Sequence, residues 1–319
     1  SFLESHGLTD ADPQPSHGVL APILAPEGVV FFGRDMESSR QVWSAEAGYP
    51  GDCDYREFYK DIGWELPLDY LGDVLPEGLR KSIGIKYHRV TGKVALGEKQ
   101  PYVRAWALEK AARHAGHFVE QRQLQVERHR SSMDRPPLIV SPYDAELFGH
   151  WWFEGPEFLD FLFRKLHFDQ DLVQPITPGE YLDRHGELEV VQPPYSTWGA
   201  KGYAEVWLNP GNDWIYPHLD MAAERMVELA RRFEWPSDLE RRALNQAARE
   251  LLLAQSSDWA FIMKTNTMVE YANKRTRDHI ARFTYLHRVL IEGGLEEAIL
   301  REFEERDNIF PDLDFRVYK

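Results

Sequence analysis

One dense segment of this 319-residue sequence, residues 141–156, holds the side chains best suited to chemistry. It follows a short apolar run, residues 136–142, of the kind that buried parallel strands have, and catalytic residues of parallel α/β folds follow the C-terminal ends of strands. Asp144 stands in this segment among Tyr143, Phe148, Trp151 and Trp152. Apolar neighbours favour the protonated form of a carboxyl group, so Asp144 is a candidate general acid. The alternative is an aspartate that caps an irregular turn.

Other polar residues have simpler interpretations. Glu154 and Glu157 flank the predicted start of a helix, whose dipole favours anions. His114 and His117 lie three apart on a predicted helix without an acidic or Cys partner at matching positions, which is typical of a solvated helix face. Cys53 stands between two aspartates, which disfavour a thiolate nucleophile.

Composition excludes several classes of partner. The chain has 52 Asp and Glu against 37 Lys and Arg, a formal charge of -15, so nucleic acid and anionic membranes are not expected partners. A single Cys excludes a disulfide framework and a Cys-rich zinc site. No apolar run reaches the roughly 20 residues that a membrane helix needs. We therefore expect a cytoplasmic protein, whose 10 Trp, 14 Tyr and 17 Phe fill the core or bind flat ligands.

The elements that must position Asp144 alternate in type along the first part of the chain. Short apolar or alternating runs predict strands at 29–33, 83–96 and 136–142, and helical patterns cover 35–43, 54–61, 102–133 and 155–167. Such an order predicts a parallel sheet, open or closed as a barrel.

Beyond Pro193-Pro194 the pattern becomes helical throughout. Four helices are predicted, at 217–233, 237–254, 267–293 and 295–307. The second begins with a capping box of Ser237 and Glu240. We therefore place a domain boundary near 193, with domains at 1–193 and 194–319.

The segment Tyr-Asp-Ala-Glu-Leu-Phe-Gly-His-Trp-Trp-Phe-Glu-Gly at 143–155 resembles the fourth signature region of glycoside hydrolase family 57, in its 1,4-α-glucan branching enzymes. Other stretches agree over nearly the whole chain. They are Phe-Gly-Arg-Asp at 32–35, Glu-Ser-Ser at 37–39, Val-Trp at 42–43, Gly-Tyr-Pro-Gly at 48–51, Tyr-Arg-Glu-Phe-Tyr at 55–59, Asp-Ile-Gly-Trp at 61–64, Gly-Ile-Lys-Tyr at 84–87, Ser-Thr-Trp-Gly at 196–199 and Ser-Asp-Trp at 257–259.

The resemblance implies the C-terminal part of an incomplete (β/α)7 barrel, followed by a helical domain that contributes to the active-site cleft. It implies a retaining mechanism in which a Glu attacks the anomeric carbon and an Asp serves as acid and base. Asp144 matches that acid/base, and His150 helps to hold the sugar. Further positions match residues that bind glucan, with aromatic rings lining its path: Trp64, Trp151, Trp198, Trp207, Asp258 and Trp259.

Two departures from the family pattern accompany the match. The nucleophilic Glu belongs to an earlier region that the matched residues do not include, and the strand-like residues 1–8 suggest a start within a domain. Pro26-Glu27 precedes Gly28 in a turn setting, so Glu27 is a poor nucleophile candidate. Ser16-His17-Gly18 stands where branching members often carry a Tyr before Gly in a mobile loop, a change that would favour hydrolysis.

The leading function is a 1,4-α-glucan branching enzyme that needs no metal or organic cofactor. Its substrate is an α-1,4-glucan, and the N-terminal part of the same enzyme is a possible partner. A 4-α-glucanotransferase or an α-amylase of the same family is the nearest alternative. A noncatalytic glucan-binding protein is the alternative from another class, if the chain truly starts at Ser1.

Overall fold

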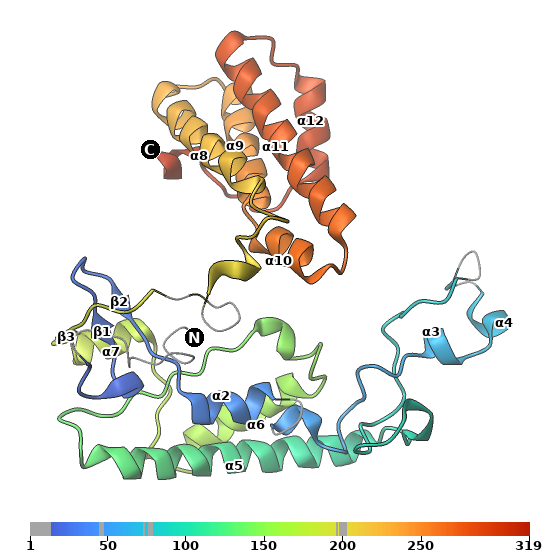
Figure 1. The fold of residues 1–319 in the computed structure, drawn as a ribbon, viewed down its shortest axis with the longest axis vertical. Helices are drawn as coiled ribbons and strands as arrows, with labels where there is room; N and C mark the ends of the chain where they lie inside the picture. The colour runs from blue at the N-terminus through green and yellow to red at the C-terminus, as the bar shows by residue number, and fades with distance from the viewer. Residues whose placement is uncertain (1–13, 45–47, 73, 76–78, 196, 198–202) are drawn as a thin grey trace. The chain divides into compact units, whose positions relative to one another are not determined.

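The computed structural model describes residues 14–44, 48–72, 74–75, 79–195, 197 and 203–319. The chain forms two compact units, Ser1–Ser196 and Thr197–Lys319, here called the N-terminal unit and the helical unit (Figure 1). Each is described by itself. The predicted strand end at 1–8 lies outside the described residues, and the interpretation of the two units as part of a barrel and a cleft-forming domain stays a prediction.

The longest helix of the N-terminal unit, α5 (Arg104–Arg130), packs alongside α6 (Gly155–Phe168) (Figure 1). Its buried face repeats every three or four residues, through Ala107, Ala111, Ala115 and Phe118. Small residues on this face let α6 approach closely. α6 begins with Pro at its first turn and buries Phe158. Both predicted helices are confirmed.

Helix α2 (Met36–Trp43) confirms the predicted helix at 35–43, and Asp35 is its N-cap, accepting a hydrogen bond from the Ser38 amide at 2.7 Å. Three further helices among the described residues of this unit are short: α3 (Ile62–Glu65), α4 (Leu68–Leu71) and α7 (Pro178–Arg184). Single 3-10 turns lie at Gly18–Leu20, Tyr49–Gly51, Leu96–Glu98 and Ala145–Leu147 in this unit, and at Ala204–Val206 and Phe315–Tyr318 in the other.

The sheet is small among the described residues. It consists of β1 (Ile23–Leu24), β2 (Val30–Phe31) and β3 (Glu189–Val190), in the order β2-β1-β3, with β1 antiparallel to β2 and parallel to β3. β2 confirms the strand predicted at 29–33. The apolar run 136–142 forms no strand there, although Leu138 donates to Leu20 O and Val140 O accepts from Asp35, both at 2.8 Å. Its prolines lack the amides that a ladder requires.

Two further predicted elements of the N-terminal unit are wrong. Residues 54–61 form no helix, and residues 83–96 contribute only isolated bridges, Arg56 with Arg89 and His88 with Pro101. Side chains replace the expected backbone ladder here, because Lys99 Nζ donates to Val90 O at 2.6 Å and Lys60 Nζ to Leu96 O at 2.7 Å. Backbone groups that are satisfied in this way need no regular structure.

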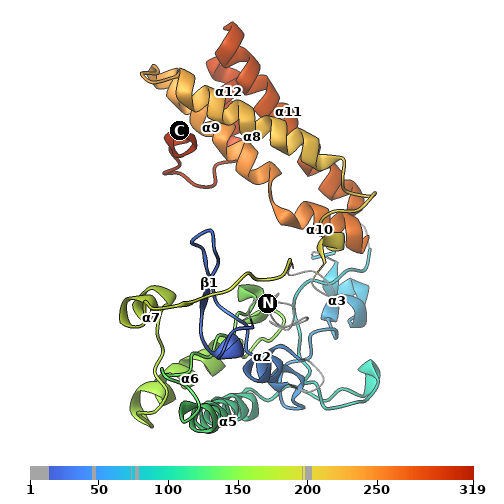
Figure 2. The same ribbon diagram turned by 60° about the vertical axis from the view of Figure 1, so that its left-hand side comes forward.

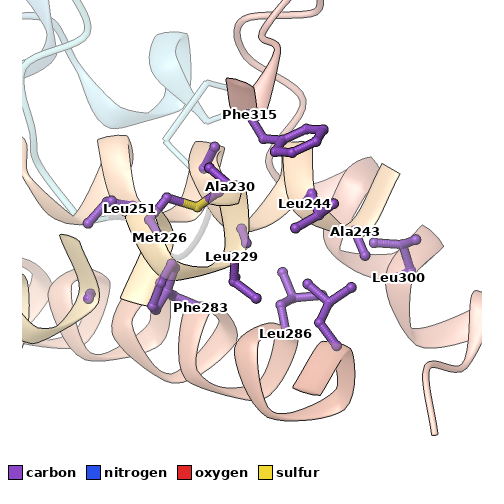
Figure 3. Close-up of a cluster of buried hydrophobic side chains, with 14 residues drawn as sticks. Met226, Leu229, Ala230, Ala243, Leu244, Leu251, Phe283, Leu286, Leu300 and Phe315 are labelled. Carbon is purple, nitrogen blue, oxygen red and sulfur yellow. The ribbon is translucent and has the colours of Figure 1, made fainter. Parts of the chain in front are cut away.

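The helical unit contains α8 (Ile215–Arg232), α9 (Asp238–Ala254), α10 (Ser257–Thr265), α11 (Val269–Glu292) and α12 (Glu297–Arg306) (Figure 2). The four helices predicted here are confirmed, and the capping box of Ser237 and Glu240 forms as expected. Helix α10 was not predicted from the sequence. Central α9 packs against α8, α11 and α12, with Met226, Leu229, Leu244 and Phe283 in the shared core (Figure 3).

None of the described helices is both long and apolar enough to cross a membrane.

Candidate active site

Asp144 is exposed, immediately before the 3-10 turn Ala145–Leu147. Its side chain does not cap that turn, so the turn-cap interpretation is wrong. Trp152, one of the aromatic neighbours expected beside it, is instead only 1% exposed and packs into the core with Tyr55 and Phe158. Within the described part of the chain no group pairs with the Asp144 carboxylate, which leaves both oxygens free for a ligand.

The backbone that leads to Asp144 is held by helix α2 and by Arg34, which precedes the N-cap residue Asp35 of that helix. Arg34 Nη2 donates to Pro142 O at 3.2 Å, and the Tyr143 hydroxyl donates to Ser38 O at 3.0 Å. The Ser38 and Ser141 hydroxyls also form a hydrogen bond with each other. Three consecutive residues before the acid are therefore fixed, which positions an exposed carboxylate on a well-ordered segment.

Asp35 connects this arrangement to α5. One of its oxygens accepts from Gln125 Nε2 at 2.6 Å, and the other accepts from the Ser38 amide and hydroxyl, at 2.7 and 2.5 Å. Nearby Arg122 is buried and donates to Glu37 Oε1 at 3.2 Å. Burial lowers the pKa of the Arg122 guanidinium below its usual range.

His150 and Trp151, both predicted site residues, lie against Phe58. The rings of Phe58 and Trp151 are stacked at 4.5 Å and 22°, and His150 meets Phe58 edge-on at 5.4 Å. We call these three residues the aromatic surface. His150 Nδ1 is 3.1 Å from Glu146 Oε1. Phe58 was missed as a site residue, and the only sequence signal was its place in a matched stretch.

Trp64 lies on α3 with 55% of its surface exposed, and its indole nitrogen donates to Ser82 Oγ at 3.0 Å. The buried Asp61 carboxylate caps this helix and accepts from the amides of Gly63, Ile83 and Gly84 at 2.8–3.0 Å. Burial opposes ionisation of Asp61, but these amides and Lys86 outweigh it and hold its pKa below the usual range.

Lys86 links α3 to the aromatic surface. Its Nζ lies 3.2 Å from Asp61 Oδ2 and 5.1 Å from the centre of the Phe58 ring. The structure thus connects Trp64 with His150 and Trp151 through Asp61, Lys86 and Phe58.

The remaining predicted residues belong to the helical unit, except Trp198, which lies outside the described residues. Trp207 and Trp259 pack against one apolar cluster around Ile215. The Trp259 indole donates to Leu253 O at 2.8 Å, while Asp258 is exposed and accepts from Ser256 Oγ at 3.2 Å. The half-buried tryptophans therefore have a structural role as well as any role with a ligand.

Glu154 stands at the start of α6 as its N-cap residue, as predicted, but its side chain is buried and makes no capping hydrogen bond. It accepts from the Arg56 amide at 3.1 Å, and burial raises its pKa. The interpretation of His114 as part of a solvated helix face is wrong. His114 is half-buried: its Nδ1 lies 2.8 Å from the Tyr55 hydroxyl, its ring stacks on Tyr49 at 4.4 Å, and burial lowers its pKa to about 4. His117 is exposed, as expected, but its Nδ1 lies 2.8 Å from the Tyr49 hydroxyl.

Two groups of described residues have the spacing of metal ligands, and lysine or arginine accompanies both. Lys110 Nζ lies 3.4 Å from carboxylate oxygens of Asp52 and Asp54, beside Cys53. In the helical unit, Arg282 lies 3.6 Å from Glu250 Oε2 and 2.5 Å from Asp307 Oδ2, next to His279. These cations already balance the carboxylates, so neither group presents a strong metal site.

The segment Ser16-His17-Gly18 is attached to its surroundings by side chains. The Ser16 amide donates to Glu189 Oε2 at 2.8 Å, and His17 Nε2 lies 3.0 Å from Asp134 Oδ1. Both contacts border a cavity of about 390 Å³. The Gly28 amide donates to Ala25 O at 2.9 Å around Glu27, which confirms the turn expected there.

Comparison with known proteins adds independent information. The family model "1,4-alpha-glucan branching enzyme, C-terminal" matches residues 218–318. A 1,4-α-glucan branching enzyme of Thermococcus kodakarensis is 37% identical over 288 residues, covering 88% of this chain and 40% of the relative. A probable 1,4-α-glucan branching enzyme of Mycobacterium tuberculosis is 27% identical, covering 98% of this chain and 57% of the relative. The chain thus spans about half the length of the curated relatives it matches.

Solved structures agree with these relatives. The α-amylase AmyC from Thermotoga maritima aligns with a TM-score of 0.80 and 46% identity, covering 98% of this chain and 59% of that one. The family 57 branching enzyme of Thermococcus kodakarensis aligns with a TM-score of 0.77 and 35% identity, covering 94% of this chain and 52% of that one. Sequence and fold together show that the chain is similar, over nearly all of its length, to the C-terminal part of 1,4-α-glucan branching enzymes of glycoside hydrolase family 57.

Proposed function

We propose that the chain forms the acid/base part of a retaining, α-glucan-acting enzyme, a 1,4-α-glucan branching enzyme. One observation carries this proposal: an exposed Asp144 carboxylate without a partner among the described residues, on a segment that Arg34 and Ser38 hold in place. A general acid must come within hydrogen-bond reach of the substrate, and an unpaired carboxylate on a fixed segment is able to do so. The family relationship supports the same role.

The proposed reaction transfers a segment of α-1,4-glucan to a 6-hydroxyl. Asp144 protonates the glycosidic oxygen of the leaving chain while a Glu outside the matched residues forms the glycosyl-enzyme bond. Asp144 then removes the proton from the acceptor hydroxyl, which attacks the anomeric carbon and releases the Glu. Residues 1–193 belong, in this proposal, to an incomplete (β/α)7 barrel, and residues 194–319 to a helical domain at the cleft.

Aromatic rings provide the glucan path. Trp64 and Trp151 are exposed in the N-terminal unit, and His150 beside Trp151 offers a hydrogen-bonding ring nitrogen. Pyranose rings stack on aromatic faces, and such stacking also excludes water, which a transferase needs for the acceptor to compete with hydrolysis. Trp198, Trp207, Asp258 and Trp259 are the further residues proposed to bind the glucan.

The test is the Asp144→Asn variant of the active enzyme on amylose, with new α-1,6 linkages as the readout. We expect a loss of about 10²- to 10⁴-fold, the usual contribution of a general acid. Asp160→Asn, which removes an exposed carboxylate of α6 that contacts Arg164, is the matched control and should leave the rate unchanged. Retained branching in Asp144→Asn would contradict the assignment.

An α-amylase is the second candidate, because AmyC from Thermotoga maritima shares 46% identity with this chain. The two candidates differ in whether water or a 6-hydroxyl accepts the glucosyl group. Counting new reducing ends against new α-1,6 linkages on amylose distinguishes them. Binding to amylose without either product would favour the noncatalytic glucan-binding alternative.

A further inference from the structure

Tyr59 combines a rigid backbone with an exposed ring. Its side chain is 70% exposed, yet its amide donates to Glu57 Oε1 at 2.9 Å, and Glu57 is buried. The other Glu57 oxygen pairs with Lys99 Nζ at 2.9 Å, where both side chains are less than 10% exposed. On the other side of Tyr59, Lys60 is buried and pairs with Glu65 at 3.2 Å.

These contacts fix the backbone without burying the ring. An exposed tyrosine on a mobile loop would lose conformational entropy on binding a ligand, whereas one held by buried ion pairs has already lost most of it. A pre-positioned aromatic face is therefore suited to bind a flat, weakly polar ligand.

Tyr59 also continues the aromatic surface. Its ring meets Phe58 edge-on at 5.2 Å and 87°, and Phe58 stacks on Trp151 at 4.5 Å. His150, Trp151, Phe58 and Tyr59 thus form an unbroken series of ring contacts that ends in an exposed face. Polar groups border the series, since Lys86 lies over Phe58 and Glu146 contacts His150.

Alternating apolar faces and polar groups match a sugar polymer, whose pyranose rings have apolar faces and hydroxyl edges. We propose that Tyr59 is a glucan-stacking residue that extends the sugar path of Trp151 and His150 by one further site. The inference rests on the proposed function, because it takes its ligand, an α-1,4-glucan, from that function. A second copy of the chain packed on Tyr59 is the alternative that the test must exclude.

The test is the binding of maltotetraose and maltoheptaose by the full chain, measured by calorimetry, with Tyr59→Ala and Tyr59→Phe variants. We expect Tyr59→Ala to weaken maltoheptaose binding about fivefold to tenfold, as for loss of one aromatic stacking contact. Maltotetraose, which has fewer pyranose rings to stack along the series, should lose no more affinity than maltoheptaose. Tyr59→Phe retains the ring and should bind like the unaltered chain.

Phe168→Ala is the matched control. Phe168 is 75% exposed at the end of α6, and the helix rise places it about 20 Å from the start of that helix near Trp151. Its removal deletes a similar apolar area without touching the series of rings, and should not change binding.

The outcomes are distinguishable. If the unaltered chain binds maltoheptaose and Tyr59→Ala binds it equally well, the Tyr59 proposal is overturned and the proposed function stands. If the unaltered chain binds neither oligosaccharide, both are overturned. A change in oligomeric state on sedimentation of Tyr59→Ala, with unchanged sugar affinity, would show a protein interface and overturn the glucan assignment.

Discussion

Different interactions stabilise the N-terminal unit and the helical unit internally. In the N-terminal unit, long irregular stretches are fixed by buried charged side chains that bond to backbone groups, as with Asp61, Lys99 and Arg34. In the helical unit, α8, α9, α11 and α12 pack around an apolar core that includes Leu229 and Leu244. The difference shows how one chain combines a stable scaffold with segments that hold reactive side chains in the open.

This comparison has a physical basis. Apolar packing is non-directional and requires side chains to be covered, so it cannot easily present a carboxylate such as Asp144 or a ring such as Tyr59 to solvent. Charge-assisted hydrogen bonds to the backbone are directional, and they fix a segment while its side chains remain exposed.

The strongest test of the contrast is Leu244→Ala in the core of the helical unit. Leu244 is completely buried, and its truncation removes apolar contacts and leaves a cavity, which costs about 4 kcal/mol. We expect faster deuterium exchange in α8, α9 and α11, and unchanged exchange in α5 and α6. The same substitution at Leu124, which is 47% exposed on α5, should cost less than about 1 kcal/mol. Equal losses at both positions would contradict the contrast.

The second test uses the pH dependence of the N-terminal unit. His114 has a pKa of about 4 when folded and an ordinary value of 6.5, so below pH 6.5 the unfolded chain binds a proton that the folded chain resists. Stability of this unit should therefore fall as the pH is lowered from 6.5 to 4, by about 3 kcal/mol in total, and not change further from this group below pH 4.

His114→Gln removes the titrating group and should flatten this slope, as measured by urea unfolding followed by deuterium exchange in α5. His117→Gln changes the exposed histidine of the same helix and serves as the control. A slope that persists in His114→Gln but disappears in His117→Gln would refute the assignment of this pH dependence to His114.

The third and smallest effect concerns Asp61. Asn at this position offers one acceptor oxygen in place of two and carries no charge. The Gly84 amide then loses its hydrogen-bond acceptor, and the Lys86 ammonium loses its anionic partner. We expect Asp61→Asn to destabilise the N-terminal unit by about 2 kcal/mol. Increased exchange should be confined to residues 61–86, together with a change in Trp64 fluorescence. Asp69→Asn, at an exposed position on α4, should change neither.

The same contrast explains which elements could be predicted. Helices of the helical unit carry apolar residues at helical spacing, and their caps are encoded locally, as by Ser237 and Glu240. The segments at 54–61 and 83–96 depend on partners far away in the sequence, such as Glu57 N with His88 O at 2.9 Å, so their local patterns misled the prediction.

The candidate site was predicted in part for a related reason. Asp144, His150 and Trp151 occur within one contiguous motif, so the resemblance of that motif to a family signature marks all three as site residues. Phe58 joins them from more than 90 positions before Trp151, through a stacking contact that no periodicity encodes. Trp152 is buried in the core. The sequence places this tryptophan near Asp144 but does not reveal that its side chain is buried in the core instead of covering the acid.

Helix α5 sets the spacing between two parts of the candidate site, the segment before Asp144 and the region around Phe58. At one point Gln125 holds Asp35 and hence the segment before Asp144; eleven residues earlier His114 holds Tyr55, close to Phe58. That interval corresponds to about 16 Å of helix. Evolution or an engineer can exchange side chains along α5 at moderate cost, but deleting one residue between these contacts would rotate one relative to the other by about 100°. We therefore expect related sequences to vary in composition here and to be constant in length.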